Sequence, residues 1–358
     1  MVKKKILICP LDWGLGHASR IIPIINALIK NNFEIIIAAD NYPLQLLKSE
    51  FPDLLTLKFP SYQISYSKGK SLVFKMLFYI PKIIFGIYKE HKRLNTIINE
   101  YKIDIVISDN RFGLWNKKIT SIFITHQVMI KMPKYFKFFE YPVHLINKWF
   151  ILKYNICWIP DFETMPNLSG DLSHKYELPN ASFIGLLSRF SRTGNYNIEK
   201  TYDIVVILSG PEPQRTIFEK IVYNQAKLID YKTLIIKGIP GKKIKTEQYE
   251  NITLVSHLLS EEINNLILST EIIICRSGYS SIMDLISLNK KAILVPTPGQ
   301  TEQEYLAQYH SNNKYFYCVF QDKFNLENDI MNLKKYSQTV LENNDKSLLY
   351  KEINKLKI

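Results

Sequence analysis

A histidine follows two glycines in the turn after the first apolar run of the chain. Gly14 and Gly16 flank Leu15, and His17 comes next. Glycines let the backbone turn tightly and leave free N–H groups at the start of a helix, where negative charge is favoured. Gly14 and Gly16 are therefore predicted to take part in binding the donor. An imidazole placed there can accept a proton from a substrate hydroxyl group. The pattern predicts a catalytic base at His17; a histidine that caps the helix or contacts phosphate is the alternative interpretation.

Polar residues also follow two later apolar runs in the first half of the chain. Asp109 ends one of them, and a carboxylate bonded to the far imidazole nitrogen would orient His17 and stabilise its protonated form. A helix cap and an ion pair with Arg111 are the alternatives for Asp109. His126 and Gln127 follow the next run and are predicted to line an acceptor pocket, with a purely structural histidine as the alternative.

Three turns in the second half suit a nucleotide diphosphate and its sugar. Ser209, Gly210 and Arg215 follow an apolar run and offer hydroxyl, amide and guanidinium groups to a diphosphate. The segment Arg276–Asp284 passes from a strand through small residues into a helix whose first N–H groups suit phosphate. Gln300–Glu304 adds amide and carboxylate side chains that suit sugar hydroxyls. A solvated loop is the alternative for each turn, and a structural ion pair is the alternative for Arg276.

Short β-branched runs alternate with amphipathic helical stretches along most of the chain. The predicted strands are Lys5–Cys9, Glu34–Ala39, Asp104–Ser108, Ser121–Thr125, Ala181–Gly185, Asp203–Leu208, Thr233–Lys237, Ile252–Val255, Glu271–Cys275 and Ala292–Val295. The predicted helices include Ser19–Lys30, Gln214–Leu228, Glu261–Leu268 and Ser280–Leu288. This alternation predicts two Rossmann-like, doubly wound α/β domains that face an interdomain cleft. Ligands of such sheets bind beyond the carboxyl ends of the strands, where the turns described above lie.

The domain boundary is predicted in the polar stretch Ser188–Lys200. An N-terminal acceptor-binding domain would then span residues 1–190, and a nucleotide-sugar-binding domain would span residues 201–335. Residues 336–358 are predicted to form a C-terminal helix that returns to the N-terminal domain.

The net charge of +13 suits an anionic partner such as a nucleotide diphosphate or an acidic membrane surface. No nucleic-acid recognition motif accompanies the charge, so a nucleic-acid partner is not expected. The four cysteines lack metal-ligand spacing. No apolar run reaches the ~20 residues that span a bilayer. The run after the first lysines is too short for a signal peptide, which favours a cytoplasmic protein.

Two stretches interleave lysines with apolar and aromatic residues, as segments that lie in a membrane interface do. They are Lys68–Arg93 and Met129–Lys153. They predict a peripheral protein on the inner face of the cytoplasmic membrane, with a lipid-linked acceptor. Helices packed on the sheet with their lysines directed outward are the alternative.

Together these residues resemble the GT-B glycosyltransferases of family 28, and within it the peptidoglycan N-acetylglucosaminyltransferases. The resemblance is concentrated in Gly14–His17, in Arg276–Asp284 with its Ser277 and Gly278, and in the pair Gln303 and Glu304. It implies an inverting hexosyltransferase that moves a sugar from a UDP-sugar, such as UDP-N-acetylglucosamine, to a lipid-linked or cell-envelope glycan. Such an enzyme needs no cofactor, and since no Asp-x-Asp motif occurs, no metal is expected.

The resemblance also assigns roles in the donor site. The Leu259 backbone would bond uracil, Ser209 and Gly210 would face the diphosphate, and Ser281 would lie near the phosphates. Asp284 would hold the ribose, and Gln303 and Glu304 would contact the sugar. This sequence departs from the family pattern at Asp284, where glutamate is usual, at Glu304, where a second glutamine is usual, and in the two prolines of the loop after Ser209.

Two other functions fit the same residues. A nucleotide-sugar hydrolase of this fold shares the pattern Gly-x-Gly-His-x-x-Arg, which His17 and Arg20 match; His17 would then activate water. A catalytically silent GT-B subunit that recruits a partner would bind nucleotide without turnover.

Overall fold

The computed structural model describes residues 3–61, 72–192, 200–239, 241, 243–341 and 347–357, and within these it leaves the side chains of residues 72–80 undescribed. The chain divides into two compact units. Unit 1 consists of residues 1–187 and 344–358, and unit 2 consists of residues 188–343. The C-terminal segment therefore lies with the first unit.

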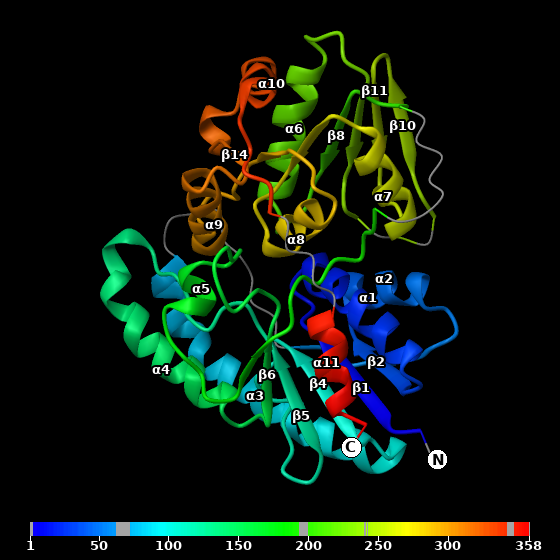
Figure 1. Cartoon of the computed structure of the whole chain (residues 1–358), viewed down its shortest axis with the longest axis vertical. Helices are drawn as coiled ribbons and strands as arrows, with labels where there is room; N and C mark the ends of the chain where they lie inside the picture. Colours follow the sequence, from blue (N-terminus) through cyan, green and yellow to red (C-terminus); the bar gives the residue numbers. More distant parts are fainter. Residues whose placement is uncertain are drawn as a thin grey trace. The chain divides into compact units, whose positions relative to one another are not determined.

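Unit 1 is built on seven parallel strands in the order β3-β2-β1-β4-β5-β6-β7 (Figure 1). The strands are β1 (Lys5–Pro10), β2 (Glu34–Ala39), β3 (Leu55–Lys58), β4 (Ile105–Asp109), β5 (Thr120–Ile124), β6 (Ile156–Ile159) and β7 (Ala181–Phe183). The strand order reverses between β1 and β4, which lie side by side at the centre of the sheet. In open α/β sheets such a switch point is where ligands bind.

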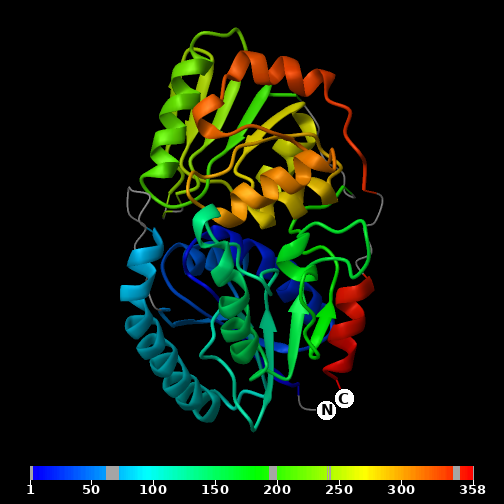
Figure 2. The same ribbon diagram turned by 90° about the vertical axis from the view of Figure 1, so that its left-hand side faces the viewer.

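Helices cover this sheet and connect its strands. They are α1 (Leu15–Lys30), α2 (Asn41–Glu50), α3 (Leu72–Tyr101), the 3₁₀ helix η1 (Lys134–Phe139), α4 (Glu140–Ile151), α5 (Asp171–His174) and α11 (Ser347–Lys355). The α3 ribbon runs along the outside of the unit (Figure 2). The C-terminal α11 packs on α1, and Lys4 Nζ donates to the carbonyl of Leu356 at 2.9 Å. Among the described residues, no helix has the length and apolar character that a bilayer span requires.

Unit 2 holds a second sheet of seven strands, in the order β10-β11-β9-β8-β12-β13-β14. The strands are β8 (Ile204–Ile207), β9 (Thr233–Ile236), β10 (Thr246–Tyr249), β11 (Ile252–Val255), β12 (Ile272–Cys275), β13 (Ile293–Leu294) and β14 (Tyr317–Cys318). Its helices are α6 (Gln214–Ala226), α7 (Ser260–Ser269), α8 (Tyr279–Ser287), α9 (Thr301–Asn312), η2 (Gln321–Lys323) and α10 (Leu326–Lys335). All pairings are parallel except that of the edge strand β10 with β11.

The predicted fold class, two parallel-sheet α/β domains, is confirmed. Each β-branched run predicted as a strand forms one, within one or two residues at its ends. Such runs are buried because helices cover both faces of a parallel sheet. The sequence analysis did not predict β3, β6, β10 or β14. The strand β10 gave no signal, because all four of its residues are exposed and show no apolar alternation. Of the two lysine-aromatic stretches, Met129–Lys153 forms η1 and α4, while residues 68–71 lie outside the described residues.

Candidate functional site

His17 lies in the first turn of α1, which begins at Leu15 after the N-cap residue Gly14. Asp109 ends β4 and pairs in the sheet with Pro10, the last residue of β1. Because β1 and β4 are neighbours, His17 Nδ1 lies 3.2 Å from each carboxylate oxygen of Asp109. The Asp109 side chain is fully buried, whereas 20% of the His17 side chain is exposed. A substrate could therefore reach the imidazole but not the carboxylate.

Arg20 follows His17 by almost one helical turn and binds the same carboxylate. Its Nε donates to Asp109 Oδ2 at 2.8 Å, and its Nη2 donates to Oδ1. The same Nη2 lies 2.8 Å from His17 Nδ1. Burial alone would raise the pKa of Asp109, but the charges of Arg20 and His17 beside it outweigh burial and hold the pKa at about 2. Asp109 is therefore an anion throughout the neutral pH range.

The predicted acceptor-side residues come from the turn after β5, next to β4 in the sheet. His126 is buried, and its Nδ1 lies 3.0 Å from Arg20 Nη1. Its carbonyl accepts a hydrogen bond from Ser173. Gln127 is half-buried, and its carbonyl accepts a hydrogen bond from the Asn147 amide at 2.8 Å. The structure thus joins His126 to His17 and Asp109 through Arg20, and it places Gln127 beside this group in the chain.

The His17 ring can act as a base in one of its tautomers. When Nδ1 carries the hydrogen and donates it to Asp109, Nε2 keeps a lone pair that can take a proton. The ionised Asp109 then stabilises the imidazolium that forms, as the carboxylate of a catalytic triad does. The contact with Asp109 is therefore compatible with general base catalysis, whereas the contact with Arg20 Nη2 needs the other tautomer, because a guanidinium N–H can only donate to Nδ1.

Packing within the chain does not require a glycine at position 14. A Cβ added to Gly14 would meet no heavy atom within 4 Å beyond its chain neighbours, and both Gly14 and Gly16 are exposed. No side chain caps the start of α1. The N-terminal end of a helix favours an anion or a developing negative charge.

A similar turn precedes α8 in unit 2. Gly278 is the N-cap residue of α8, no side chain caps the helix, and an added Cβ would meet nothing within 4 Å. Ser281, in the first turn, is half-buried. Ser209 and Gly210 follow β8, and Gly210 has a φ of +100°, a conformation that glycine adopts more readily than other residues. These turns lie at the carboxyl ends of β8 and β12.

Three predicted donor ligands support the neighbouring turn through hydrogen bonds. Gln303 Oε1 accepts from the Thr297 N–H and Glu304 Oε1 accepts from the Gly299 N–H, both at 2.9 Å. Ser277, which is buried, donates its hydroxyl to the Gln303 carbonyl at 2.9 Å. These bonds join the start of α9 to the turns after β12 and β13.

The backbone groups of Leu259 are used within α7. Its N–H donates to Glu262 at 2.9 Å, and its carbonyl accepts from the Ile263 N–H at 3.1 Å. The Leu259 side chain is exposed at the start of the helix. The structure therefore shows this residue opening α7, with its N–H already bonded.

The two arginines predicted to bind phosphate have their guanidinium groups bonded within unit 2. Arg215 donates to Glu212 and to Glu219, each at 2.7 Å. Arg276 is fully buried against the Phe218 ring, and burial lowers its pKa to about 10. Its donors go to four acceptors, which are the carbonyls of Val295, Pro296 and Gln214 and the side chain of Gln321. In this structure both side chains support the turns and do not extend from them.

Asp284 lies on α8 and contacts the beginning of the segment that leads into unit 2. Ser188 Oγ donates to Asp284 Oδ1 at 2.7 Å, and Arg189 Nε lies 3.9 Å from Oδ2. Burial raises the pKa of Asp284 to about 6, although Arg189 and Ser188 partly oppose the effect. The predicted ribose ligand is therefore a buried carboxyl group that titrates near neutrality.

Sequence reasoning missed the two residues that organise these carboxyl groups. Arg20 was matched only as part of a motif, although its spacing of three from His17 places both on one helix face. The Ser188 contact joins residues 96 apart and left no signal in the pattern. Among the described residues, no group of three or more His, Cys, Asp and Glu side chains gathers as metal ligands would.

The C-terminal part of the chain matches a known family. Residues 204–357 match the glycosyltransferase family 28 C-terminal domain. The matched range contains the candidate donor residues of the second half of the chain, from Ser209 to Glu304, but not Gly14 and Gly16.

Two curated proteins are similar in sequence. One is the UDP-N-acetylglucosamine–N-acetylmuramyl-(pentapeptide) pyrophosphoryl-undecaprenol N-acetylglucosamine transferase of Sulfurihydrogenibium sp. (strain YO3AOP1), 26% identical over 115 residues. That match covers 32% of this chain and only 29% of the length of the enzyme. The other is an uncharacterized glycosyltransferase of Methanosarcina acetivorans, 23% identical over 334 residues, which cover 84% of this chain and 81% of that protein.

A solved structure agrees over nearly the whole length. The glycotransferase of kitacinnamycin superposes with a TM-score of 0.61 at 12% identity, covering 99% of this chain and 95% of its own. Such low identity bears on the fold alone, and the fold is that of GT-B glycosyltransferases. Taken with the family 28 domain, these similarities support a glycosyltransferase of the GT-B type.

Proposed function

We propose that this protein is an inverting glycosyltransferase that moves a sugar from a UDP-sugar, such as UDP-N-acetylglucosamine, to a lipid-linked or cell-envelope acceptor. The observation that carries the proposal is the partly exposed His17 imidazole 3.2 Å from the buried Asp109 carboxylate, at the switch point of the unit 1 sheet. The family 28 domain in the C-terminal part supports a nucleotide-sugar donor.

In the proposed reaction His17 acts as the base. Nε2 takes the proton of the acceptor hydroxyl while that oxygen attacks the anomeric carbon of the donor. The bond from the anomeric carbon to the diphosphate breaks, and the nucleoside diphosphate leaves with the bonding electron pair. Attack from the face opposite the leaving group inverts the anomeric configuration. Asp109 then holds the charged imidazolium through Nδ1 until the proton is released to water.

Backbone N–H groups are the proposed partners of the departing diphosphate. The start of α8 after Gly278 and the turn at Ser209 and Gly210 offer such groups without a side-chain cap. Arg215 and Arg276 would contribute indirectly, because their donors hold the same turns in place. We propose that no metal or other cofactor takes part, so a chelator should leave the transfer rate unchanged.

An apolar surface on unit 1 supports a membrane-bound acceptor. We call it the α4 surface and define it by the exposed side chains Tyr135, Phe138, Tyr141, Leu145, Ile146, Trp149 and Leu152. From Phe138 onward all of these but Ile146 recur every three or four residues along η1 and α4, and Ile146 adjoins Leu145, which places the set on one side of the helix. The most exposed are Tyr135 at 83% and Phe138 at 70%. An anionic bilayer surface is the partner that such a face would suit.

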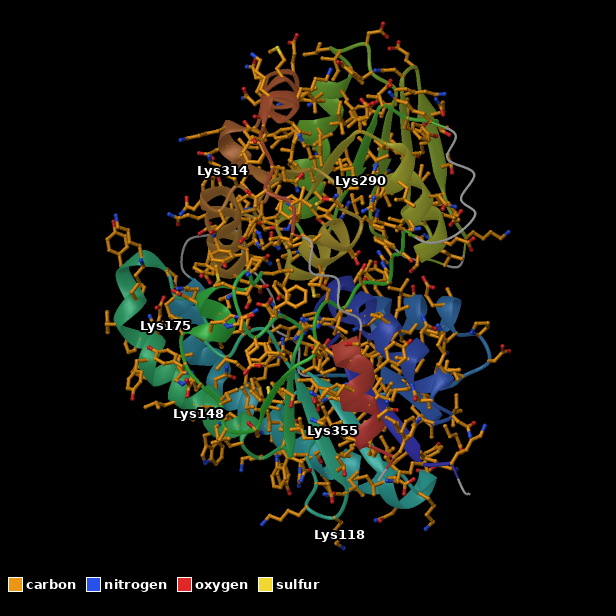
Figure 3. All side chains as sticks on the ribbon, viewed as in Figure 1. Lys118, Lys148, Lys175, Lys290, Lys314 and Lys355 are labelled. Atoms are coloured by element: carbon orange, nitrogen blue, oxygen red, sulfur yellow. The ribbon has the colours of Figure 1, made fainter. Side chains whose placement is uncertain are left out.

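Lysines lie near the α4 surface, whereas the acidic residue of the same stretch is buried. Lys134 and Lys137 are exposed, and Lys153 Nζ lies over the Trp149 ring at 3.9 Å. Glu140, the single acidic residue of Met129–Lys153, is buried and lies 3.8 Å from Lys175. Lys148 and Lys175 flank the helix on the same side of unit 1 (Figure 3).

Vesicle sedimentation tests the membrane part of the proposal. The protein should co-sediment with vesicles of phosphatidylcholine and phosphatidylglycerol, and the double variant Phe138→Ser, Trp149→Ser should lose at least ten-fold in binding. Leu228→Ser is the matched control, because Leu228 is 83% exposed but lies in unit 2. Equal binding by the wild type and the double variant would contradict a role of the α4 surface.

A product assay tests the reaction. The protein is incubated with radiolabelled UDP-N-acetylglucosamine, with and without undecaprenyl-pyrophosphoryl-linked acceptor. The proposal expects label in the lipid fraction only when the acceptor is present. Stoichiometric release of free sugar without acceptor would instead establish the hydrolase, and donor binding without either product would establish the silent subunit.

A further inference from the structure

Thr297 follows β13 in unit 2 and lies between two prolines, Pro296 and Pro298. Neither proline has an N–H group, and a residue before a proline is restricted to extended conformations. The Thr297 N–H donates to Gln303 Oε1 at 2.9 Å, and the Thr297 carbonyl accepts from the Gln300 N–H at 3.1 Å. Both backbone groups of Thr297 are therefore bonded, and the turn holds the residue in place.

The Thr297 hydroxyl, in contrast, is buried without a hydrogen-bond partner. Only 1% of the residue is exposed, and no partner for Oγ1 is found among the described residues. Thr233, at the start of β9, is also buried, but its Oγ1 donates to the Tyr231 carbonyl at 3.0 Å. A buried hydroxyl that makes no hydrogen bond destabilises a fold, so its presence calls for a reason such as a ligand.

The unpartnered hydroxyl faces the turn after β8. A Cβ added to Gly210 would lie 3.5 Å from Thr297 Oγ1 and would meet no other described heavy atom within 4 Å beyond its chain neighbours. Gly210 is exposed, and its φ of +100° disfavours any residue with a side chain. This side of Gly210 is therefore open, and a ligand that lies against it comes within reach of the Thr297 hydroxyl.

The topology of unit 2 explains why two residues so far apart in the chain meet. The parallel strands β8 and β13 flank β12, so the carboxyl ends of all three lie at one edge of the sheet. The strand order reverses between β8 and β12, which makes this edge the place where ligands of open α/β sheets bind. The uncapped start of α8 after Gly278 follows β12, between the other two turns in the strand order.

We propose that Thr297 is a donor-binding residue whose hydroxyl donates a hydrogen bond to a phosphate oxygen of the nucleoside diphosphate. The inference rests on the proposed function, because it adds a ligand to the same donor site. Ionised phosphate oxygens only accept hydrogen bonds, and the Thr297 hydroxyl has a donor without an acceptor. The start of α8 favours the same negative charge. Because the turn already holds Thr297, little conformational entropy is lost when the bond forms.

Calorimetric titration of the whole protein with UDP tests the proposal. Thr297→Val removes the hydroxyl and keeps the branched shape, so the Kd for UDP should rise ~10–100-fold, as expected for the loss of a hydrogen bond to a charged group. Thr297→Ser keeps the hydroxyl, and its Kd should stay within ~3-fold of the wild type. Equal Kd values for UDP in the wild type and Thr297→Val would overturn the proposal. A loss seen with UDP-N-acetylglucosamine but not with UDP would also overturn it, because the hydroxyl would then contact the sugar.

Thermal unfolding without ligand separates this role from a structural one. Thr297→Val should keep or raise the Tm, because it removes a buried hydroxyl that has no partner. Thr233→Val is the matched control, because it removes a buried hydroxyl that is bonded to the Tyr231 carbonyl at the amino end of β9. Its Tm should fall by about 2–4 °C while its Kd for UDP stays that of the wild type. A fall in the Tm of Thr297→Val as large as that of Thr233→Val would overturn the proposal, since the hydroxyl would then be bonded within the chain.

The failure of this inference differs from the failure of the proposed function. A wild type that binds UDP no more tightly than Thr297→Val does would remove only the role of Thr297. A wild type that binds neither UDP nor the UDP-sugar would remove the nucleotide-sugar donor, and both proposals would be wrong.

Discussion

Two buried aspartates, one in each unit, differ in how an arginine meets them. Asp109 receives two donors from Arg20, and its pKa is held at about 2 despite burial. Asp284 receives the Ser188 hydroxyl, while the Arg189 Nε stays 3.9 Å away, and burial raises its pKa to about 6. Direct contact with a guanidinium thus keeps one carboxyl charged, and its absence lets burial dominate at the other.

The difference in pKa between Asp109 and Asp284 indicates that the two aspartates have different roles. A permanently ionised Asp109 suits a residue that orients a base and stabilises the imidazolium. Asp284 sits on the helix that follows the uncapped Gly278 turn, in the part of the chain that matches the family 28 domain, where binding of the donor is proposed. We therefore expect substitutions at the first aspartate to change turnover and substitutions at the second to change donor affinity.

Replacing each aspartate by asparagine should separate turnover from binding. Asp109→Asn should lower kcat by ~10²–10⁴ with a nearly unchanged Kd for the donor, because only the orientation and stabilisation of the base are lost. Asp284→Asn should weaken donor binding ~10-fold and leave single-turnover rates at saturating donor within a few-fold. Stopped-flow turnover and calorimetric titration with the UDP-sugar measure the two effects. A loss of donor affinity in Asp109→Asn as large as its loss of turnover would contradict the assignment of Asp109 to turnover and Asp284 to donor binding.

The same pair should respond to pH with opposite signs. Because the pKa of Asp109 lies below its ordinary value of 3.8, Asp109 stabilises the fold above about pH 4, and this contribution is lost as pH falls toward 2. The pKa of Asp284 lies above the ordinary value, so its ionisation lowers the free energy of unfolding by about 3 kcal/mol as pH rises from 4 to 6. Urea unfolding from pH 4 to 7 should show this decline in the wild type, with the Asp284 part missing in Asp284→Asn. An identical pH dependence in that variant would contradict the assignment.

Two glycines of unit 2 allow a smaller test. Gly278→Ala should weaken donor binding ~10-fold with little effect on stability, because an added Cβ meets no atom of the chain but would project over the start of α8. Gly238→Ala is the control with the reverse pattern. There φ is +67° and the Cβ would lie 2.4 Å from the Leu208 carbonyl oxygen, so we expect a loss of ~1–3 kcal/mol in stability. Unchanged donor affinity in Gly278→Ala would argue against a ligand at this turn.

Much of the fold was predictable, because β-branched runs and amphipathic stretches alternate with few exceptions. The contact of His17 with Asp109 followed once β1 and β4 were neighbours, and the doubly wound pattern places both strand ends on one edge of the sheet. The polar edge strand Thr246–Tyr249 could not be found, since its pairing depends on β11 and not on its own apolar pattern.

The side-chain partners of the charged residues were harder to predict. Arg276 at the end of a strand gives the same sequence signal whether it faces a ligand or turns inward to the Val295 and Gln214 carbonyls. The spacing that links Arg20 to His17 is local, but its contact with Asp109 crosses 89 residues. Local patterns therefore located the turns, and only the packed structure showed which side chains are already bonded.

The most direct test of the account is the behaviour of His17→Ala with donor and acceptor both present. We predict that turnover falls by ~10²–10⁴ while the Kd for the UDP-sugar, measured by calorimetry on the same preparation, stays within two-fold of the wild type. That result would identify His17 as the base of the transfer. Wild-type turnover in His17→Ala, or a loss of donor affinity as large as the loss of turnover, would contradict it.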